Sequence, residues 1–465
     1  MPPDEPRGPA LSGLLLIALG VFLLQPPSAH SQKAPDTDPS SVTLEQALRE
    51  NSYPLRVRNE SLRGRGGEWL RSHAADAAIV TLGEVHGTKE IPAIMGALFN
   101  DLQAAGEMDH LALEVSPWTA ALMSDSLQAP NSSFTSFVER HPATVPFYAL
   151  QPERDLVRNF VRQSDAERPL WGLDQIFAFT TDLALDRLTD LAPTAEARRA
   201  VAKTRASART DSTTDPALSG LPPSLPTPLM VSPRAAFDTL DAYFQGAREA
   251  QQLLDELAIS TEIYRINDTN NYRSNQIRAR YLRKNLRRQH QRAEASQEKP
   301  PQVAIKVGGR HAYRDRTPNN ALDVGNLAVA LAERSGGTAL NVMVVCGPNS
   351  TARDYPAGTT DCWAEHRSVF TSALGDGPTL FDLTAIHPLL HEETLDPPPR
   401  VERMLWGLRR GGACPQRTAV LPHRPHHWKL SMPSGPLCAR WGPVSCCPVS
   451  VQYRPQNTER KADLQ

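Results

Sequence analysis

Short apolar runs that end at a glycine constrain the fold of this chain most strongly. Residues 77–82 form one such run before Gly83, and residues 302–307 form another before Gly308. Further apolar runs lie at residues 110–115, 169–174, 339–346 and 380–383, and helical stretches at 42–50, 90–103 and 320–334. Short buried strands that alternate with helices form parallel sheets through right-handed crossovers. The sequence therefore predicts an α/β fold, with a mostly parallel sheet, flanking helices and a helical insertion.

The strand and helix pattern covers residues 42–405, which we expect to form one α/β domain. It is interrupted at residues 194–233, which are first charged, then rich in serine and threonine, and then rich in proline. Such low-complexity composition is typical of a surface insertion or linker. Residues 234–293 have a strongly helical composition, with a basic end, and are expected to form a helical subdomain.

Residues 1–31 have the pattern of a secretory signal peptide. Residues 11–24 form an apolar stretch of the length typical of a signal-peptide core, which is short for a bilayer span. Ala29 and Ser31 supply the small residues expected before a cleavage site, which predicts cleavage after Ser31. Two acidic residues near the start offset the positive charge that such peptides usually carry, so an uncleaved anchor remains an alternative.

Export also predicts the environment of the mature protein, which we expect to be periplasmic or secreted. Residues 32–41 are interpreted as a disordered leader. No other apolar stretch approaches the ~20 residues of a transmembrane helix, so no membrane span is expected after cleavage. In an oxidising compartment Cys346 and Cys362 could form a disulfide.

The C-terminal residues 406–465 differ in composition from the rest of the chain. They contain four of the six cysteines and many prolines, without the periodicity of a strand or helix. Because an α/β domain of this kind should finish with a buried strand, we interpret residues 408–465 as the product of a shifted reading frame that leaves a sheet edge uncovered. The alternative is a genuine disulfide-rich tail, which export favours.

Two predicted strand ends carry groups suited to chemistry. Gly83 is followed by Glu84 and His86, and the strand before Gly308 leads to His311 and Arg314. The carboxyl ends of parallel strands form the ligand-binding edge of an open sheet. Two imidazoles delivered there by different strands are expected to converge on one site, although a single histidine after a strand is more often a packed or surface residue.

Two acids are expected at the same edge of the sheet. Glu114 ends the run that begins at residue 110, and Asp174 ends the run at residues 169–174. Each could face the predicted site, or could cap the helix that follows its strand.

These residues resemble a known superfamily. The paired Gly-x-x-His motifs, Gly83–His86 and Gly308–His311, with acids at Glu84 and Glu114, are similar to those of the superfamily that joins the erythromycin esterases, the ChaN-type haem-binding lipoproteins and the Tiki metalloproteases. The resemblance spans about residues 70–390. The first motif is one residue shorter than the esterase form and closer to the ChaN and Tiki forms, which leaves the substrate open.

A helix late in the chain extends the resemblance. Arg278, Leu282 and Asn285 have the spacing of an erythromycin esterase helix that carries arginine, methionine and asparagine. Leu282 replaces that methionine, and Ala279 stands where the family usually has aspartate. The resemblance implies that Asp174, Arg278 and Asn285 bind substrate.

The side chains suit activation of water rather than attack by a protein nucleophile. No Gly-x-Ser-x-Gly elbow follows a usable strand. In one version His86 is the general base, supported by Glu84 or Glu114, and His311 and Arg314 stabilise the oxyanion. In the other version His86, His311 and Glu84 bind manganese, cobalt or zinc, and the metal activates the water. The resemblance implies the first version for erythromycin esterases and the second for Tiki proteins.

Two hypotheses of function follow from these residues. The first is an exported hydrolase that cleaves an ester or amide in a small-molecule or peptide substrate. The second is a ChaN-type periplasmic protein that binds haem or iron, because histidine is a natural ligand of haem iron. Fifty basic residues balance fifty-one acidic residues, which argues against nucleic acid as a partner.

Overall fold

The computed structural model describes most of the chain between residues 42 and 423. The gaps in this description are residues 130–132, 142–143, 215–227, 297–298, 348–349, 355–357, 362–364, 376, 392–394, 396, 398–400, 403–404 and 406–416. The predicted signal peptide, the predicted leader, Cys362 and most of the C-terminal tail lie outside the described residues. No helix in the described part is long and apolar enough to cross a membrane.

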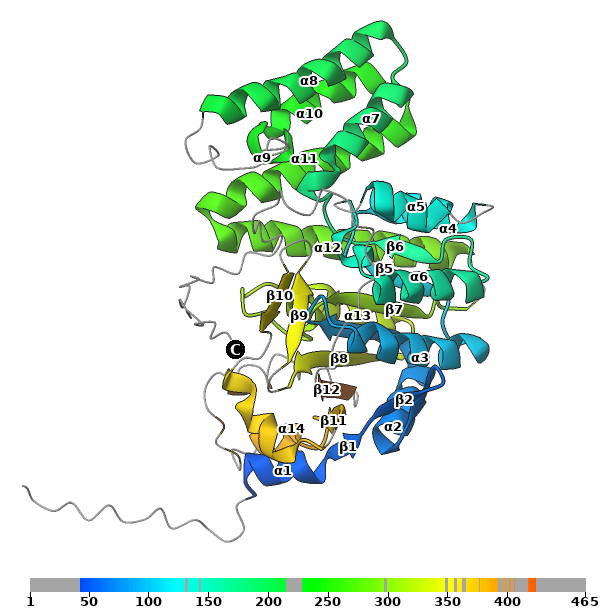
Figure 1. The fold of residues 1–465 in the computed structure, drawn as a ribbon, viewed down its shortest axis with the longest axis vertical. Coiled ribbons are helices and arrows are strands. Elements are labelled where there is room, and N and C mark those ends of the chain that lie inside the picture. Colours follow the sequence, from blue (N-terminus) through cyan, green and yellow to red (C-terminus); the bar gives the residue numbers. More distant parts are fainter. Residues whose placement is uncertain are drawn as a thin grey trace, which may run out of the picture. The chain divides into compact units, whose positions relative to one another are not determined.

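An eight-stranded sheet is the centre of the fold, and it has the α/β character that the sequence predicts (Figure 1). Its strands, in spatial order, are β1 (Ser52–Pro54), β11 (Thr379–Asp382), β12 (Arg417–His423), β8 (Thr338–Cys346), β4 (Ala77–Glu84), β7 (Val303–Gly308), β5 (His110–Leu113) and β6 (Leu170–Gly172). The six strands from β12 to β6 are parallel to their neighbours, and β11 and β1 add an antiparallel edge. Two small antiparallel sheets lie outside this sheet: one pairs β2 (Arg56–Arg58) with β3 (Ser61–Arg63), and the other pairs β9 (Thr351–Asp354) with β10 (Gly358–Asp361).

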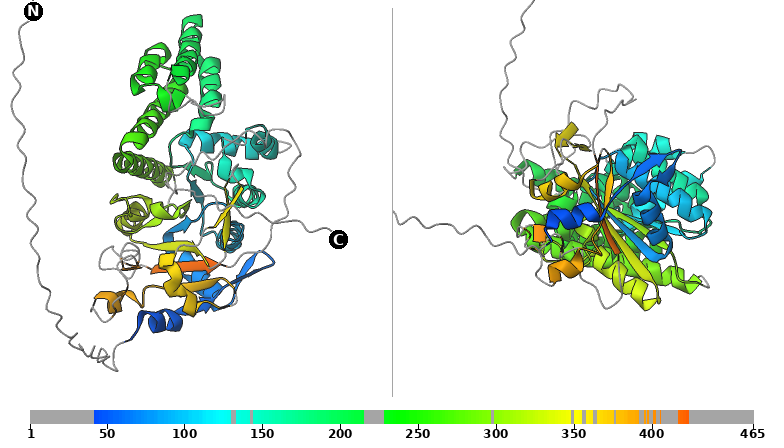
Figure 2. Two further views of the ribbon diagram at one scale, coloured as in Figure 1. Left: turned by 60° about the vertical axis from the view of Figure 1, so that its left-hand side comes forward. Right: turned by 90° about the horizontal axis from the view of Figure 1, so that it is seen from below.

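Helices cover both faces of the sheet because successive residues of its strands point to opposite sides (Figure 2). In β4, Val80 and Leu82 join one hydrophobic core, whereas Ile79 joins the other. The first core is completed by α2 (Arg65–Ala75), α3 (Glu90–Ala104), α4 (Pro117–Gln128), α5 (Ser133–Arg140) and α6 (Gln151–Gln163). The second is completed by α1 (Leu44–Glu50), α12 (Asn271–Ser296), α13 (Val324–Arg334), η6 (Glu365–Ala373) and α14 (His387–His391).

A third hydrophobic core belongs to the helical insertion, whose boundaries differ from those predicted. Its helices are α7 (Thr181–Leu191), α8 (Ala195–Thr214), α9 (Pro228–Val231), α10 (Arg234–Asp241) and α11 (Arg248–Thr269). The first half of the predicted low-complexity insert is therefore the helix α8, because Ala197 and Val201 on it are buried in this core. The predicted subdomain 234–293 also ends too late, since α12 packs on the sheet through Leu282 and Leu286.

One part of the C-terminal tail forms a strand, contrary to expectation. Residues 417–423 make β12, which pairs in parallel with β8 and in antiparallel with β11. This strand fills the position at which the sequence predicts an uncovered sheet edge. The run from Ala419 to Leu421 is apolar but too short to show a period among the surrounding prolines, so only the pairing edges of β8 and β11 identify it as a strand. Cys346, at the end of β8, is disulfide-bonded.

Candidate active site

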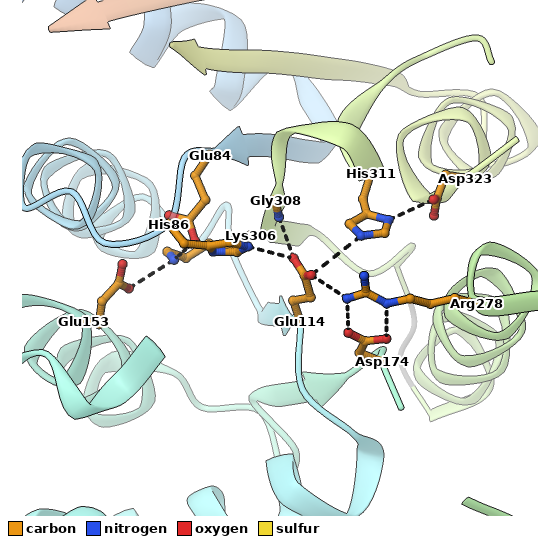
Figure 3. Close-up of polar contacts among 10 residues, drawn as sticks. All are labelled: Glu84, His86, Glu114, Glu153, Asp174, Arg278, Lys306, Gly308, His311 and Asp323. Carbon is orange, nitrogen blue, oxygen red and sulfur yellow. Dashed lines mark hydrogen bonds and ion pairs between the residues drawn. The ribbon is translucent and has the colours of Figure 1, made fainter. Parts of the chain in front are cut away.

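The ends of β4, β7 and β5 lie side by side and bring Glu84, His86, Glu114 and His311 together (Figure 3). In the register of the sheet Glu84 is opposite Gly308, and Glu114 directly follows β5. Both motif glycines are required by close packing. A Cβ atom on Gly83 would lie 2.5 Å from the Cβ of Ala312, and one on Gly308 would lie 2.9 Å from Nε2 of His86.

His86 is held from three sides. Its Nδ1 lies 2.8 Å from Oε1 of Glu84, and its Nε2 lies 3.5 Å from Oε2 of Glu114. Its ring stacks on Phe147 of η1 (Pro146–Ala149), with the ring centroids 4.1 Å apart. The carboxylate at Nδ1 favours the tautomer that carries its proton there, which leaves the lone pair on Nε2. The His86 side chain is 18% exposed, so solvent can reach it.

His311 repeats this arrangement from the other side of the site. It lies in the short helix η5 (Gly309–Ala312), where its Nδ1 is 2.8 Å from Oδ2 of Asp323 and its Nε2 is 3.6 Å from Oε1 of Glu114. The other carboxylate oxygen of Asp323 accepts the N–H of Val324 and caps α13. Sequence reasoning missed Asp323, although an acid directly before a helix is a recognisable cap signal.

Glu114 lies between the two histidines and binds further donors. Its Oε2 accepts the backbone N–H of Gly308 at 2.5 Å, and its Oε1 accepts Nη2 of Arg278 at 2.7 Å. Burial opposes ionisation of this carboxyl, but the positive charges of His311, His86 and Arg278 outweigh that effect and hold its pKa well below the usual range. Glu114 is therefore an anion and a weak base, and the histidines are the groups able to exchange protons near neutral pH.

The same carboxylates raise the proton affinity of both histidines. Burial lowers the pKa of each imidazole, but Glu114 and Glu84 raise the pKa of His86 above its ordinary value overall. In the same way Asp323 and Glu114 raise the pKa of His311. The separations of 3.5 and 3.6 Å from Glu114 are too long for good hydrogen bonds, so each Nε2 stays available to another partner.

The three residues expected to bind substrate have partners within the protein. Arg278 donates from Nε to Oδ1 of Asp174 at 2.9 Å and from Nη2 to its Oδ2, so it links Asp174 to Glu114. Asn285, about two turns further along α12 and on the same face, donates to the backbone oxygen of Leu173 at 2.8 Å. Asp174 is fully buried. These contacts attach α12 to the ends of β5 and β6 and hold Glu114 in place.

Arg314 does not join the other predicted site residues. Its side chain is buried, and none of the hydrogen bonds or ion pairs of the described residues connects it to His311 or Glu114. Its Nε and Nη2 have no hydrogen-bond partner. Burial lowers its pKa to about 10, and the acid that acts on it is Glu333. The predicted role in stabilising an oxyanion therefore has no support in these contacts.

Sequence reasoning missed two buried charged groups beside the site. Lys306 of β7 lies between Glu84 and Glu153, with its Nζ 2.5 Å from Oε1 of Glu84 and 3.1 Å from Oε2 of Glu153 (Figure 3). Burial raises the pKa of Glu153 to about 7, although Lys306 acts in the opposite direction. The available signal was Lys306 itself, because a lysine inside an otherwise apolar buried strand needs a partner.

The predicted metal-binding set does not fit the geometry. Among the described residues no group of three histidine, cysteine, aspartate or glutamate side chains is arranged to hold a metal ion. Oε1 of Glu84 is in contact with the ammonium of Lys306 and with Nδ1 of His86, and Glu114 accepts a guanidinium and a backbone N–H. Positive groups and N–H donors thus contact both oxygens of Glu114 and one oxygen of Glu84, whereas Oε2 of Glu84 is buried without a hydrogen-bond partner.

Comparisons with known proteins find similarities of fold. No family model matches the chain, and no curated protein matches it. A solved mutant of the erythromycin esterase EreC in its open conformation is 16% identical, with a TM-score of 0.47 over 67% of this chain and 84% of that one. A protein from Bacillus cereus is 13% identical, with a TM-score of 0.46 over 73% of this chain and 85% of that one.

A haem-bound ChaN of Campylobacter jejuni is also similar, at 12% identity and a TM-score of 0.27 over 62% of this chain and 89% of that one. EreC and ChaN bear the names of two of the families that the sequence motifs resemble. At these identities and TM-scores the matches concern the fold alone, and they say nothing about the activity of this chain.

Proposed function

We propose that this protein is an exported hydrolase that activates water with a pair of histidines and cleaves an ester or amide bond. The observation that carries the proposal is the placement of Glu114, whose two oxygens face Nε2 of His86 and Nε2 of His311 at 3.5 and 3.6 Å. Each imidazole is also bound at Nδ1 by a carboxylate of its own. This arrangement orients two proton-exchanging groups toward one position.

The two histidines are suited to different parts of the reaction. His86 is the more exposed of the two, and in its neutral form Nε2 can accept the proton of an attacking water. Asp323 and Glu114 raise the pKa of His311 and so favour its protonated form, and in that form it can stabilise a developing oxyanion and later protonate the leaving group. The same residues favour amide or ester cleavage without a covalent intermediate, because no serine or cysteine nucleophile is in contact with either imidazole in the described part of the chain.

The proposal is tested by assaying purified protein on a panel of carboxylic esters and peptides, before and after chelation, and with manganese, cobalt or zinc added back. We expect hydrolysis of at least one substrate, and we expect the activity to survive chelation. Activity that vanishes on chelation and returns with one metal would contradict the metal-free mechanism. A strong Soret band on titration with haem, without hydrolysis in any condition, would replace the hydrolase with a haem-binding protein.

The acid limb of the pH profile of kcat/KM is expected to lie at higher pH than an ordinary histidine would give. A general base works only when it is neutral, and Glu114 and Glu84 keep His86 protonated to higher pH than an ordinary imidazole. We therefore expect kcat/KM to rise with pH through an apparent pKa above 6.5, and to fall again when the acidic partner loses its proton. The measurement is kcat/KM between about pH 5 and about pH 10. An acid limb near the pKa of an ordinary carboxyl would assign the base to a carboxylate instead.

A further inference from the structure

Beyond Glu84 the site continues as a row of buried charged side chains, Glu84, Lys306 and Glu153. Glu84 and Lys306 lie on the same face of the sheet as the first hydrophobic core, the face that α6 covers, and both are almost completely buried. Lys306 contacts the same carboxylate oxygen, Oε1 of Glu84, that binds Nδ1 of His86 at 2.8 Å. A displacement of that oxygen therefore moves the partner that sets the orientation and tautomer of His86.

Glu153 is the last charged side chain of this row and lies on α6. Its carboxylate reaches Lys306 at 3.1 Å, and its side chain is 2% exposed. A lysine ammonium buried in an apolar strand is costly without compensating charge, and two carboxylates on either side of it compensate it and fix its position. None of the hydrogen bonds or ion pairs of the described residues joins Glu153 or Lys306 to an imidazole, so the two residues act on His86 through the position of Glu84 and through their charges.

We infer that Glu153 is a positioning residue for the proposed hydrolysis: through Lys306 it holds Glu84 against Nδ1 of His86 and adds negative charge that favours the protonated base. This inference rests on the proposed function for its effect on turnover. Its effect on the titration of His86 follows from the geometry alone and does not require a substrate.

The charged and titratable groups that act on Glu153 come from three elements besides α6. They are Lys306 of β7, Glu84 and His86 at the end of β4, and Tyr148 of η1. Glu153 and His86 attract each other, whereas Lys306 disfavours the imidazolium. Removal of the negative charge of Glu153 leaves the positive charge of Lys306 less compensated. Both changes act in the same direction, so His86 should then lose its proton at lower pH.

The test is Glu153→Gln, which keeps the shape of the side chain and removes its charge. We expect the acid limb of kcat/KM to move to lower pH, with kcat reduced on the order of ten-fold and KM little changed. In protein labelled with carbon-13 at histidine Cε1, the His86 signal, assigned by its loss in His86→Gln, should titrate at lower pH than in the wild type. Glu153→Asp, which retains the charge, should return both curves toward the wild type.

The matched control is Glu256→Gln. Glu256 is also a buried glutamate whose pKa burial raises to about 7, but it accepts the N–H of Trp118 at 3.1 Å, and no hydrogen bond or ion pair of the described residues joins it to His86, Glu84 or Lys306. We expect its removal to leave the titration of His86 unchanged. If the His86 signal in Glu153→Gln titrates as in the wild type, or at higher pH, the inference is overturned. Absence of hydrolysis in the wild type would instead overturn the proposed function, and the NMR titration would still decide the role of Glu153.

Discussion

Replacement of Glu114 by glutamine is expected to reduce kcat/KM by roughly 10³-fold or more, because it removes the anion that both histidines share. The two carboxylate oxygens of Glu114 have different hydrogen-bond donors: Oε2 accepts the N–H of Gly308, and Oε1 accepts an N–H of the Arg278 guanidinium. An amide has only one oxygen. In either orientation its NH₂ group must therefore face a donor, which displaces the side chain or leaves a buried donor without an acceptor.

We also expect the pH profile of kcat/KM to shift in Glu114→Gln. Glu114 raises the pKa of both His86 and His311, so its loss should move the remaining acid limb to lower pH. The measurements are kcat, KM and the pH profile of the variant on the best substrate of the panel. Glu294→Gln is the control, since Glu294 lies on α12 and pairs with Arg334 near the surface. A Glu114→Gln enzyme that retained more than about a tenth of wild-type kcat/KM would exclude Glu114 from the mechanism proposed here.

Replacement of Lys306 by methionine is expected to destabilise the fold by about 3–5 kcal/mol at neutral pH. The substitution keeps the length and apolar stem of the side chain but leaves Glu84 and Glu153 buried together without their cation. Removing one member of a buried ion pair costs this much because an uncompensated charge remains in a medium of low dielectric constant. The measurement is the free energy of unfolding in urea, with circular dichroism as the readout.

The change of the free energy of unfolding with pH distinguishes uncompensated buried charge from simple loss of packing as the cause of the destabilisation in Lys306→Met. Burial already raises the pKa of Glu153 to about 7, and loss of the lysine charge raises it further and raises the pKa of Glu84 as well. A carboxyl whose pKa is higher in the folded state loses stability as pH rises from its unfolded to its folded pKa. The destabilisation should thus be larger at pH 8 than at pH 5. Arg49→Met, in an exposed pair with Glu45, should cost less than about 0.5 kcal/mol, and an equal loss in both variants would contradict the prediction.

Much of the fold could be predicted because buried parallel strands leave a direct mark on the sequence. The runs that became β4, β5, β7 and β8 are short, apolar and bounded by glycine or polar residues. The short antiparallel edge strand β1 and the small sheets β2–β3 and β9–β10 are harder to recognise in the sequence, since each of their strands has only three or four residues. The strand β12 was not predicted either, because its pairing with β8 and β11 identifies it as a strand and its own composition does not.

The helical insertion shows a second limit of sequence reasoning. Composition indicated helices in residues 234–293 but could not assign them to a core. Burial of Leu282 and Leu286 against the sheet separates α12 from the insertion, whereas Leu253 and Leu257 place α11 within it. The apolar faces of the two helices look alike in sequence, and only their neighbours distinguish them.

By itself the sequence determined which strand ends carry histidine and carboxylate, and hence that His86, His311, Glu84 and Glu114 could share an edge of the sheet. Chain order and strand pattern suffice for this, because parallel strands all end on the same side. Only the tertiary structure decided that Glu114 faces both imidazoles, that Arg314 lies apart, and that Lys306, Glu153 and Asp323 complete the site. Those relations depend on distances between side chains that are up to 222 residues apart in the chain, and no local pattern records them.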